Sequence, residues 1–255
     1  MPGRKVESKK RVPASIGSVK GASVSLVIPI YNQAEYVEET TRAYAKAFSS
    51  SPLIQSFEII LVSNNCSDST PQICARLAKS IPHVRHFDYP FKTLKGGAVL
   101  RGFQHATFSL IGFTDADMAT APEQFLKLIP PLLSNARVGA VIASRQVPGA
   151  TMHPAQPFFR RFLGLGFSVL RELLFNLGVK DSQCGAKLFR KDALLPFGLK
   201  TNGFTFDVEL LYRVRQSGFS IVEIPIAWND RAGSTVKFFS PIHMLVELIS
   251  LRLRI

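Results

Sequence analysis

The sequence predicts an α/β protein with a mostly parallel sheet that is covered by helices on both faces. Short, nearly continuous apolar runs rich in Val and Ile alternate with longer stretches whose apolar residues recur at helical spacing. Strands that are apolar on both faces are typical of a parallel sheet buried between two helical layers. With 255 residues, the chain is long enough to form one large domain with a full core.

The expected elements alternate from the first strand onward. The run VSLVIPI at 24–30 predicts a strand because β-branched residues dominate it. The stretch Asp68-Ser-Thr-Pro71 predicts a helix start because proline is favoured in the first turn. The other elements follow the same two patterns, with helices expected at 34–48, near 95–107 and near 122–134, and strands at 57–63, near 83–88, at 109–114 and at 138–144.

The positive charge is spread over the chain and is densest at its start. The formal net charge is +13 at pH 7, and residues 1–20 contribute +5 of it because six Lys or Arg residues there face one acid, Glu7. We interpret residues 1–21 as a disordered basic arm, since few apolar residues accompany these charges, and 22–255 as one domain. A solubilising tail and a contact with anionic lipid headgroups both fit such an arm.

Cysteine content and hydropathy limit the cellular setting. Cys66, Cys74 and Cys184 form neither an even disulfide set nor a metal-ligand spacing, which favours a reducing compartment. No window of 18 apolar residues is free of charge, so we expect no transmembrane helix.

Polar residues follow the predicted strands. Tyr31 and Asn32 follow the first strand, and the segment 64–68 follows the second. Asp115 and Asp117 follow the apolar run SLIGFT. Because the carboxyl ends of parallel strands meet at one edge of a sheet, we expect a ligand to bind there.

The Asp115-Ala116-Asp117 sequence places two like charges next to each other. The carboxylates repel each other unless a positive charge lies close by. Such a pair suits Mg²⁺ or Mn²⁺, which takes one or two carboxylates and fills its other positions with water and phosphate oxygens. A solvated turn or a helix cap is the alternative explanation for an isolated Asp-X-Asp sequence.

Seven segments together resemble one enzyme family. They are, in order, VSLVIPIYNQAEYVEE, VSNNCSDST, KGGAVLRGFQHA, FTDADMAT, ASR, DSQCGAKLF and FTFDVELLYR. Their order and spacing resemble the family 2 inverting glycosyltransferases with the GT-A fold, over roughly residues 22–255. Within that family the chain is most similar to the dolichyl-phosphate β-glucosyltransferases and related polyprenyl-phosphate glycosyltransferases, chiefly through DADMAT and DSQCGAKLF.

The resemblance implies a Rossmann-like GT-A domain that binds a nucleotide diphosphate sugar. UDP-glucose is the implied donor, and a polyprenyl or dolichyl phosphate is the implied acceptor. Asp117 matches the principal metal ligand and Asp115 the acid near the ribose and diphosphate, with Mg²⁺ or Mn²⁺ stabilising the departing diphosphate. The other implied donor contacts are Pro29, Tyr31, Asn32, Glu35, Asn64, Lys95, Ala116 and Lys237.

Two departures from the family pattern leave the nucleotide open. Where the family usually has Asp-Asp-Gly-Ser, residues 63–66 read SNNC, so the amide oxygen of Asn64 is expected to accept the base N–H that a carboxylate commonly accepts. Thr235 stands where a Lys often follows Gly-Ser, and Lys237 is expected to reach the phosphates instead. A donor such as GDP-mannose therefore remains an alternative.

The implied acceptor requires positioning more than a general base. A phosphate monoester carries about −1.5 to −2 charge at pH 7 and is already a nucleophilic anion. Arg145 and Arg160 match basic positions that hold the acceptor phosphate in related enzymes, and an ordinary surface charge is the alternative at each. Asp181 matches an acid near the acceptor, with an orienting or weak-base role or a role in capping its turn, and Gln183 is expected to support it by hydrogen bonding.

Two apolar segments are expected to lie at a membrane interface. Residues 156–178 and 238–255 are dense in Phe and Leu, yet they contain arginines such as Arg171 and Arg252. A charge at the centre of a bilayer costs about 2.5–3.5 kcal/mol, which argues against crossing it. Apolar helices fringed by arginine predict peripheral attachment to the cytoplasmic face of a membrane. Packing on the sheet or on another subunit of a homo-oligomer is the alternative.

Two other functional classes fit parts of the sequence. An enzyme of the same fold can transfer a sugar to a hydroxyl group instead of a phosphate. A nucleic-acid-binding protein is suggested only by the basic charge. Because no base-reading or stacking motif accompanies that charge and Trp228 is the single Trp, we expect no nucleic-acid partner.

Overall fold

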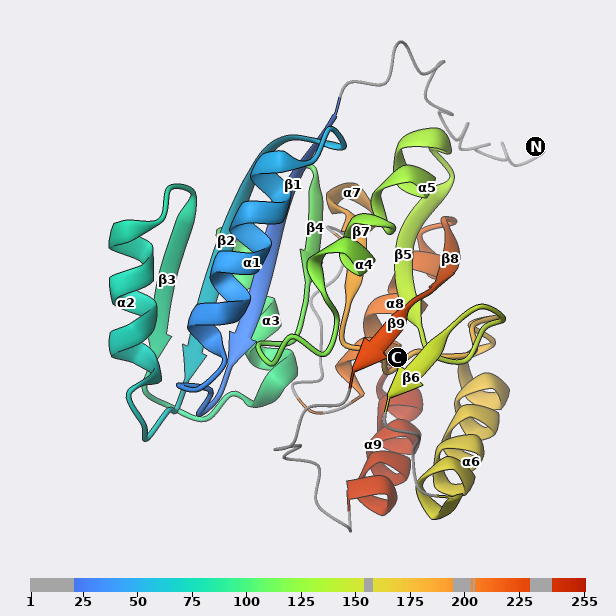
Figure 1. Ribbon diagram of the computed structural model, residues 1–255. Coiled ribbons are helices and arrows are strands. Elements are labelled where there is room, and N and C mark those ends of the chain that lie inside the picture. The colour runs from blue at the N-terminus through green and yellow to red at the C-terminus, as the bar shows by residue number, and fades with distance from the viewer. Residues whose placement is uncertain (1–20, 154–157, 195–202, 204, 230–239) are drawn as a thin grey trace, which may run out of the picture.

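The computed structural model describes residues 21–153, 158–194, 203, 205–229 and 240–255 and contains a seven-stranded sheet (Figure 1). Residues 1–20 of the expected basic arm and Lys237 lie outside the described residues. The strand order is β3-β2-β1-β4-β7-β5-β8, and β7 alone runs antiparallel to its neighbours. The strands are β1 (Ala22–Ile30), β2 (Ile54–Asn64), β3 (Val84–Tyr89), β4 (Leu110–Phe113), β5 (Val138–Ser144), β7 (Lys187–Arg190) and β8 (Ser220–Pro225). The prediction of a mostly parallel α/β sheet is confirmed.

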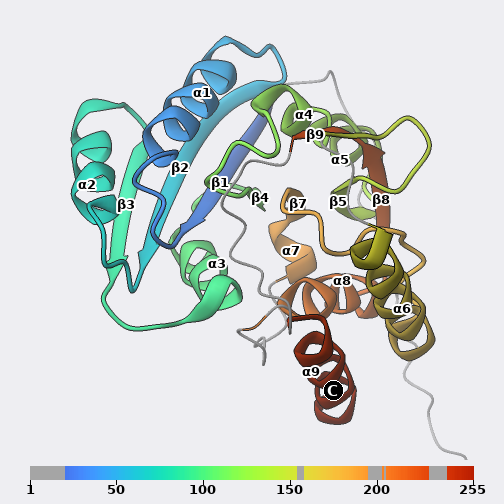
Figure 2. The ribbon, with the colours of Figure 1, turned by 60° about the horizontal axis from the view of Figure 1, so that its bottom comes forward.

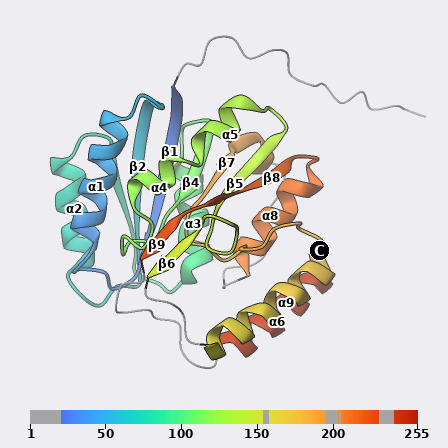
Figure 3. The same cartoon turned by 45° about the vertical axis from the view of Figure 1, so that its right-hand side comes forward.

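Helices cover both faces of this sheet (Figures 2 and 3). One face carries α1 (Val37–Ser50), α2 (Thr70–Ser80), α4 (Pro122–Leu126) and α5 (Ile129–Ser134). The other face carries α3 (Leu94–His105), α7 (Lys191–Leu194) and α8 (Phe206–Gln216). A short parallel pair, β6 (Thr151–His153) and β9 (Ala227–Asn229), forms a second sheet.

The alternation of side chains along β1 explains the two layers. Leu26 and Ile28 belong to the core cluster that contains Tyr44 of α1, whereas Val27 between them belongs to the opposite cluster. Gly102 of α3 lies so close to β1 that a Cβ atom there would be 2.3 Å from Val27 Cγ1. The absence of a side chain at this glycine therefore sets how closely α3 approaches the sheet.

The prediction of one helix at 122–134 was wrong, because the structure has two short helices there. Pro130 and Pro131 lie in the first turn of α5. A proline within a continuous helix removes an N–H donor and clashes with the carbonyl four residues earlier, which for Pro130 is that of Leu126, the last residue of α4.

The helices α6 (Phe158–Phe175) and α9 (Ser240–Arg254) pack side by side and extend beyond one end of the sheet (Figures 1 and 3). Phe167 and Phe175 of α6 and Leu248 and Leu251 of α9 are buried in the same core cluster as α8. Each helix therefore packs one face internally. Within the described part of the chain, we find no helix with both the length and the hydropathy needed to cross a membrane.

Candidate active site

The strands β1, β2 and β4 end at the same edge of the sheet, which we call the carboxyl edge (Figure 2). The segment 114–120 leaves β4 at this edge and is anchored by α1. Thr40 Oγ1 donates to Ala116 O at 2.8 Å, and Tyr44 Oη donates to Thr120 O at 2.8 Å. Because both contacts are buried, the backbone that carries the two aspartates is fixed.

The same segment is held on its other side by β9. Asn229 N donates to Ala119 O at 3.1 Å, and Thr120 forms an isolated β-bridge with Trp228. Met118, between these contacts and the aspartates, adopts a φ of +60°, a left-handed conformation that is rare outside glycine. The structure therefore holds a strained turn directly after Asp117, as is common at functional sites.

Asp115 is paired with Lys95 of α3. Lys95 Nζ lies 2.5 Å from Asp115 Oδ1. Burial lowers the pKa of Lys95, but the carboxylates of Asp115, Asp207 and Asp117 together outweigh burial and raise it above its ordinary value, so the ammonium group stays charged. The carboxylate of Asp115 also rests on the backbone of Gly185, where a Cβ atom would lie 1.8 Å from Asp115 Oδ2. Lys95 is thus one positive charge that the aspartate pair required.

Asp117 has less compensation than Asp115. Burial and the neighbouring Asp115 raise the pKa of Asp117 above its ordinary value, although the N–H of Ala119 donates to Asp117 Oδ1 at 3.0 Å. A raised carboxyl pKa means that positive charge is insufficient around the ionised group. The two carboxylates therefore fit a divalent cation. No group of three or more His, Cys, Asp or Glu among the described residues is arranged to hold a metal ion, so such a cation takes other ligands from water or phosphate.

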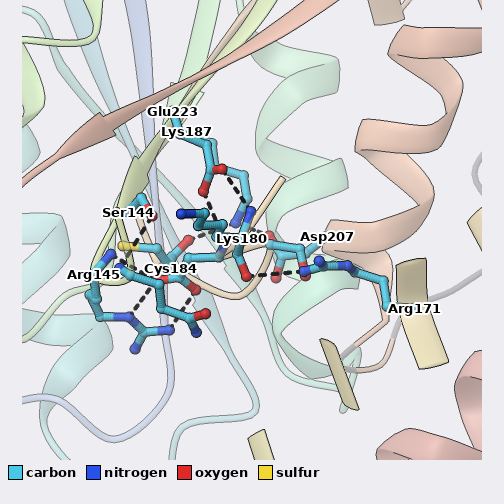
Figure 4. Close-up of polar contacts among 11 residues, drawn as sticks. Ser144, Arg145, Arg171, Lys180, Cys184, Lys187, Asp207 and Glu223 are labelled. Atoms are coloured by element: carbon cyan, nitrogen blue, oxygen red, sulfur yellow. Dashed lines mark hydrogen bonds and ion pairs between the residues drawn. The ribbon is translucent and has the colours of Figure 1, made fainter. Parts of the chain in front are cut away.

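Arg145 and Asp181 form a bidentate ion pair (Figure 4). Arg145 Nε lies 2.7 Å from Asp181 Oδ2, and Arg145 Nη2 lies 2.9 Å from Asp181 Oδ1. Burial tends to raise the pKa of Asp181, but its bonds with Arg145 hold the pKa below the ordinary value. The guanidinium carbon also lies 5.3 Å from the centre of the Trp228 ring. The geometry favours an orienting role for Asp181 over a weak-base role, because an ionised, bonded carboxylate of low pKa accepts protons poorly.

The backbone that precedes Asp181 is fixed by two buried or half-buried charges. Glu223 of β8 accepts hydrogen bonds from the N–H groups of Lys180, at 2.6 Å, and Asp181, at 2.9 Å. Arg171 of α6 donates to the carbonyl groups of Val179 and Lys180 (Figure 4). The prediction that Arg171 fringes an interface helix was wrong, because its side chain is only 3% exposed and binds this backbone.

Gln183 presents an unpaired donor next to this ion pair. Its side-chain Nε2 is buried, and among the described residues it has no hydrogen-bond partner. Buried amide groups without partners are rare in folded proteins, because leaving one unpaired costs about 1–3 kcal/mol. A phosphate or sugar oxygen bound beside Gln183 would satisfy it.

The loop after β1 meets the loop after β2 mainly through neutral groups, and the carboxylate of Asp68 also accepts a hydrogen bond from Ala34 N at 3.2 Å. Asn32, with a φ of +50°, accepts a hydrogen bond from Ser67 N at 2.8 Å and donates to Ser67 Oγ at 3.1 Å. Tyr31 and Glu35 are exposed beside it. Pro29 lies further inside, in register with Val62 of β2. The structure thus brings together the four residues implied as the first donor segment.

Asn64 differs from its expected role. Its side-chain Oδ1 accepts hydrogen bonds from Thr93 N at 2.9 Å and Thr93 Oγ1 at 3.0 Å, and Nδ2 lies 3.4 Å from Leu94 O. Both lone pairs of the amide oxygen are therefore used by the start of α3. A nucleobase can bond to this oxygen only if Thr93 moves.

Two further residues differ from the sequence prediction: the side chain of one predicted residue is not described, and one residue near the site was not predicted. Arg160 lies in α6, and its side chain is not among those described. Lys187 of β7 was missed. Its Nζ is completely buried and donates to Asp207 Oδ1 at 2.5 Å and to Cys184 O at 2.6 Å (Figure 4). A lysine inside the apolar run GAKLF was the available signal, because a buried lysine requires a partner.

The chain is similar in sequence to known glycosyltransferases. The family model described as "Glycosyl transferase family 2" matches residues 25–195. The dolichyl-phosphate beta-glucosyltransferase ALG5C of Trichomonas vaginalis is 31% identical over 95% of this chain and 75% of that protein. The glycosyltransferase AglD of Haloferax volcanii is 30% identical over 89% of this chain, and the match spans only 36% of that longer protein.

Two solved structures share the fold. One is glucosyl-3-phosphoglycerate synthase from Mycobacterium tuberculosis in complex with Mn²⁺, UDP and phosphoglyceric acid, with a TM-score of 0.66, 19% identity and coverage of 96% of this chain and 84% of that chain. The other is the mannosyltransferase PcManGT from Pyrobaculum calidifontis in complex with GDP-Man and Mn²⁺, with a TM-score of 0.67, 19% identity and coverage of 97% and 68%. The fold is therefore that of the GT-A glycosyltransferases. The chain belongs to glycosyl transferase family 2.

Proposed function

We propose that this glycosyltransferase transfers a sugar, with inversion, from a nucleotide diphosphate sugar to a polyprenyl or dolichyl phosphate. One observation carries the proposal. The segment 181–185 contacts Arg145 at one end and Asp115 at the other. A phosphate-binding group and a cation-binding group therefore flank one short backbone segment, as transfer between a diphosphate and a phosphate requires.

The donor side follows from the charges at the carboxyl edge. Asp115 and Asp117 would hold the divalent cation, which stabilises negative charge on the departing nucleotide diphosphate. Lys95 is a second positive charge beside Asp115. The two solved GT-A structures are complexes with Mn²⁺, and this supports a divalent cation without deciding between Mn²⁺ and Mg²⁺.

The acceptor side favours an anion over a hydroxyl group. In the proposed reaction, a phosphate oxygen bonds to the anomeric carbon while the bond from that carbon to the diphosphate breaks, so no proton needs removal from the acceptor. Asp181 suits this chemistry because its bonds with Arg145 keep it ionised and orient the guanidinium group. A hydroxyl acceptor instead requires a base near the operating pH.

The proposed sugar and nucleotide are supported by similarity to other glycosyltransferases. Glucose is favoured by the similarity to dolichyl-phosphate beta-glucosyltransferases, of which ALG5C is one, and UDP by the likeness to the glucosyl-3-phosphoglycerate synthase solved with UDP. GDP-mannose is the second candidate, supported by the likeness to PcManGT. Because Thr93 donates hydrogen bonds to the Asn64 oxygen that was expected to bind the base, base recognition is the part of the site that differs most from the expectation.

A peripheral membrane location at the cytoplasmic face belongs to the same proposal. The outer surface of α6 exposes Leu165, Val169 and Leu173, which recur every four residues on one face, and Leu173 is 78% exposed. The neighbouring α9 exposes Val246, Ile249 and Leu253 together with Arg252 and Arg254. Apolar stripes beside exposed arginines support attachment to an anionic bilayer surface, and a homo-oligomer contact is the competing explanation.

A transfer assay tests the reaction. The purified protein is incubated with a polyprenyl phosphate and either UDP-[¹⁴C]glucose or GDP-[¹⁴C]mannose, with Mn²⁺, with Mg²⁺ or with EDTA, and label in the organic phase is counted. We expect cation-dependent transfer to the phosphate and none to the matching polyprenol, which lacks the phosphate. Transfer to the polyprenol would identify a hydroxyl acceptor instead.

Vesicle flotation tests the membrane surface. Leu173→Glu should reduce binding to vesicles that contain phosphatidylserine, whereas Ala75→Glu, at an exposed neutral position on the remote helix α2, is the control with the same change of charge. Unchanged flotation of Leu173→Glu, combined with a smaller particle in sedimentation, would show that the stripe joins two subunits.

A further inference from the structure

Lys187 and Asp207 form a buried ion pair behind the carboxyl edge. Lys187 is 0% exposed, and its Nζ lies 2.5 Å from Asp207 Oδ1 of α8 (Figure 4). The same Nζ lies 5.2 Å from the centre of the Phe113 ring. Burial raises the pKa of Asp207, and Lys187 only partly offsets this. The pair is too deep to touch a substrate directly, so its role must lie in what it contacts.

The pair contacts the backbone on which Asp115 rests. Lys187 Nζ donates to Cys184 O at 2.6 Å, and the next residue, Gly185, is the one whose Cα lies against the carboxylate of Asp115. Lys187 also pairs in register with Phe113, two residues before Asp115. One lysine therefore connects the strand that ends before the aspartates with the backbone that packs against them.

We propose that the Lys187–Asp207 ion pair is a positioning element that sets the place of Asp115 in the cation site. The proposal rests on the cation-binding role given to Asp115 in the proposed function. The ammonium group of Lys187 binds the Cys184 carbonyl, and this contact fixes the position of the next residue, Gly185. Because Gly185 has no side chain, the carboxylate of Asp115 fits against its Cα atom.

Energetics support a role beyond stability. Removing two charges from water is costly, and well-packed apolar residues in place of a buried ion pair often give equal or greater stability. Stability alone therefore does not explain a lysine at this position. Metal sites, by contrast, depend on outer contacts that orient the ligands, and the loss of such contacts typically weakens metal affinity or activity by about 10- to 100-fold.

The pair also limits repulsion at the site. Asp207 interacts electrostatically with both Lys95 and Asp115. Lys187, in direct contact with Asp207, offsets part of the negative charge of that carboxylate locally, and Lys95 remains available to Asp115. A neutral residue in place of Lys187 alone would leave Asp207 to compete for Lys95.

Three variants test the proposal. Lys187→Met removes the cation, and Lys187→Met/Asp207→Leu replaces the whole pair by apolar groups. Gly185→Ala places a methyl group where Asp115 Oδ2 now lies. Arg190→Met is the matched control, since Arg190 lies on the same strand but donates to the carbonyl of Val138, at the end of β7 that pairs with Leu110.

The measurement is Mn²⁺ affinity in the presence of UDP or GDP, by electron paramagnetic resonance of free Mn²⁺, beside the Tm of each protein. We expect the double variant to recover the Tm that Lys187→Met loses, yet to bind Mn²⁺ about 10- to 100-fold more weakly than wild type. Gly185→Ala should show the same weakening with a small change in Tm, and Arg190→Met should change Tm without changing Mn²⁺ affinity.

Wild-type Mn²⁺ affinity in the double variant would overturn the proposal and make the pair purely structural. The same holds if Gly185→Ala binds Mn²⁺ normally. The assay contains no acceptor lipid, so a wild-type protein that binds Mn²⁺ and nucleotide but labels no lipid would refute the proposed acceptor and leave this inference standing. A wild-type protein that binds no Mn²⁺ with either nucleotide would refute the inference.

Discussion

The two sides of the carboxyl edge are built from different interactions. On the side of β1 and β2, mainly neutral amide and hydroxyl groups join the loops, as in the contacts of Asn32 with Ser67 and of Asn64 with Thr93. One carboxylate, that of Asp68, also takes part there by accepting a hydrogen bond from Ala34 N. On the side of β4, β5 and β7, charged groups do so, and the pairs are Lys95–Asp115, Arg145–Asp181 and Lys187–Asp207.

This difference shows where the site tolerates change. A neutral hydrogen bond contributes about 0.5–1.5 kcal/mol, whereas a buried charge left without its partner costs several times more. The departure from the family pattern at residues 63–66 falls on the neutral side. The segments DADMAT and DSQCGAKLF, which match the family, supply one member of each of the three pairs: Asp115, Asp181 and Lys187. We therefore expect substitutions on the charged side to have the larger effects.

The largest effect is expected for Asp117→Asn. Turnover should fall by about a hundredfold or more, because a neutral amide is a poor ligand for the divalent cation, and such a cation contributes several kcal/mol of transition-state stabilisation. The measurement is kcat with saturating donor over a range of Mn²⁺ concentrations. Unchanged turnover and unchanged Mn²⁺ dependence would remove Asp117 from the cation site.

The same variant should be at least as stable as wild type when no metal is present. The folded-state pKa of Asp117 is raised, so stability is lost as the pH rises from the ordinary value toward the folded value, and at pH 7 the charged form opposes folding. Asparagine removes that cost and keeps an oxygen for the Ala119 N–H. Thermal unfolding in EDTA should give an equal or higher Tm, and added Mn²⁺ with UDP should raise the Tm of wild type alone.

The next effect is expected for Arg145→Ala. Acceptor kcat/KM should fall by roughly ten- to a hundredfold, because one charge-assisted phosphate contact contributes about 1.5–3 kcal/mol. Arg145→Lys should recover only part of this, because a point charge does not reproduce the bidentate fork. Donor Kd should stay unchanged in both variants. Equal losses of donor affinity and acceptor use would assign Arg145 to the donor diphosphate.

A stability effect of smaller size is expected for Asp181→Asn, and it should depend on pH. The bonds with Arg145 hold the pKa of Asp181 below its ordinary value, so its contribution to stability is present above about pH 4 and is lost as the pH falls through the folded-state value. The variant should lose about 1–3 kcal/mol of unfolding free energy at pH 7. In urea titrations, the difference from wild type should shrink below pH 4; a constant difference would exclude this ionic origin.

The sequence predicted those parts of the site that depend on local pattern. The strands β1, β2 and β4 were visible in apolar runs, and the placement of Asp115 and Asp117 followed from the end of the third run. Long-range contacts were not visible. Four residues, KLFR, form the antiparallel strand β7 inside a parallel sheet, and no local property of so short a run sets its direction.

Partners distant in sequence explain the other differences. Arg171 looked like a surface charge on an apolar helix, because its acceptor carbonyls lie eight and nine residues away in a turn whose path the sequence does not give. Thr93, which occupies the oxygen of Asn64, is 29 residues further along the chain. In each case the sequence does not show which two polar groups lie close enough to form a hydrogen bond, because that depends on the tertiary arrangement of the strands and loops.

The smallest effect is expected for Asn64→Asp, and it tests the neutral side directly. A carboxylate accepts the hydrogen bonds of Thr93 N and Oγ1 as the amide oxygen does and loses only the long contact of Nδ2 with Leu94 O at 3.4 Å, so the start of α3 should keep its place. If base recognition does not depend on Asn64, the Kd for UDP, measured by calorimetry with Mn²⁺, should change by less than about threefold, which is under 1 kcal/mol. Asn64→Ala is the control, since it leaves the Thr93 N–H without its acceptor and should lower unfolding free energy by about 0.5–1.5 kcal/mol while sparing kcat.

A tenfold gain in UDP affinity for Asn64→Asp, without a matching gain for GDP, would mean that the base does reach this side chain. The neutral side would then select the nucleotide, and the contrast between the two sides would be one of specificity rather than of tolerance.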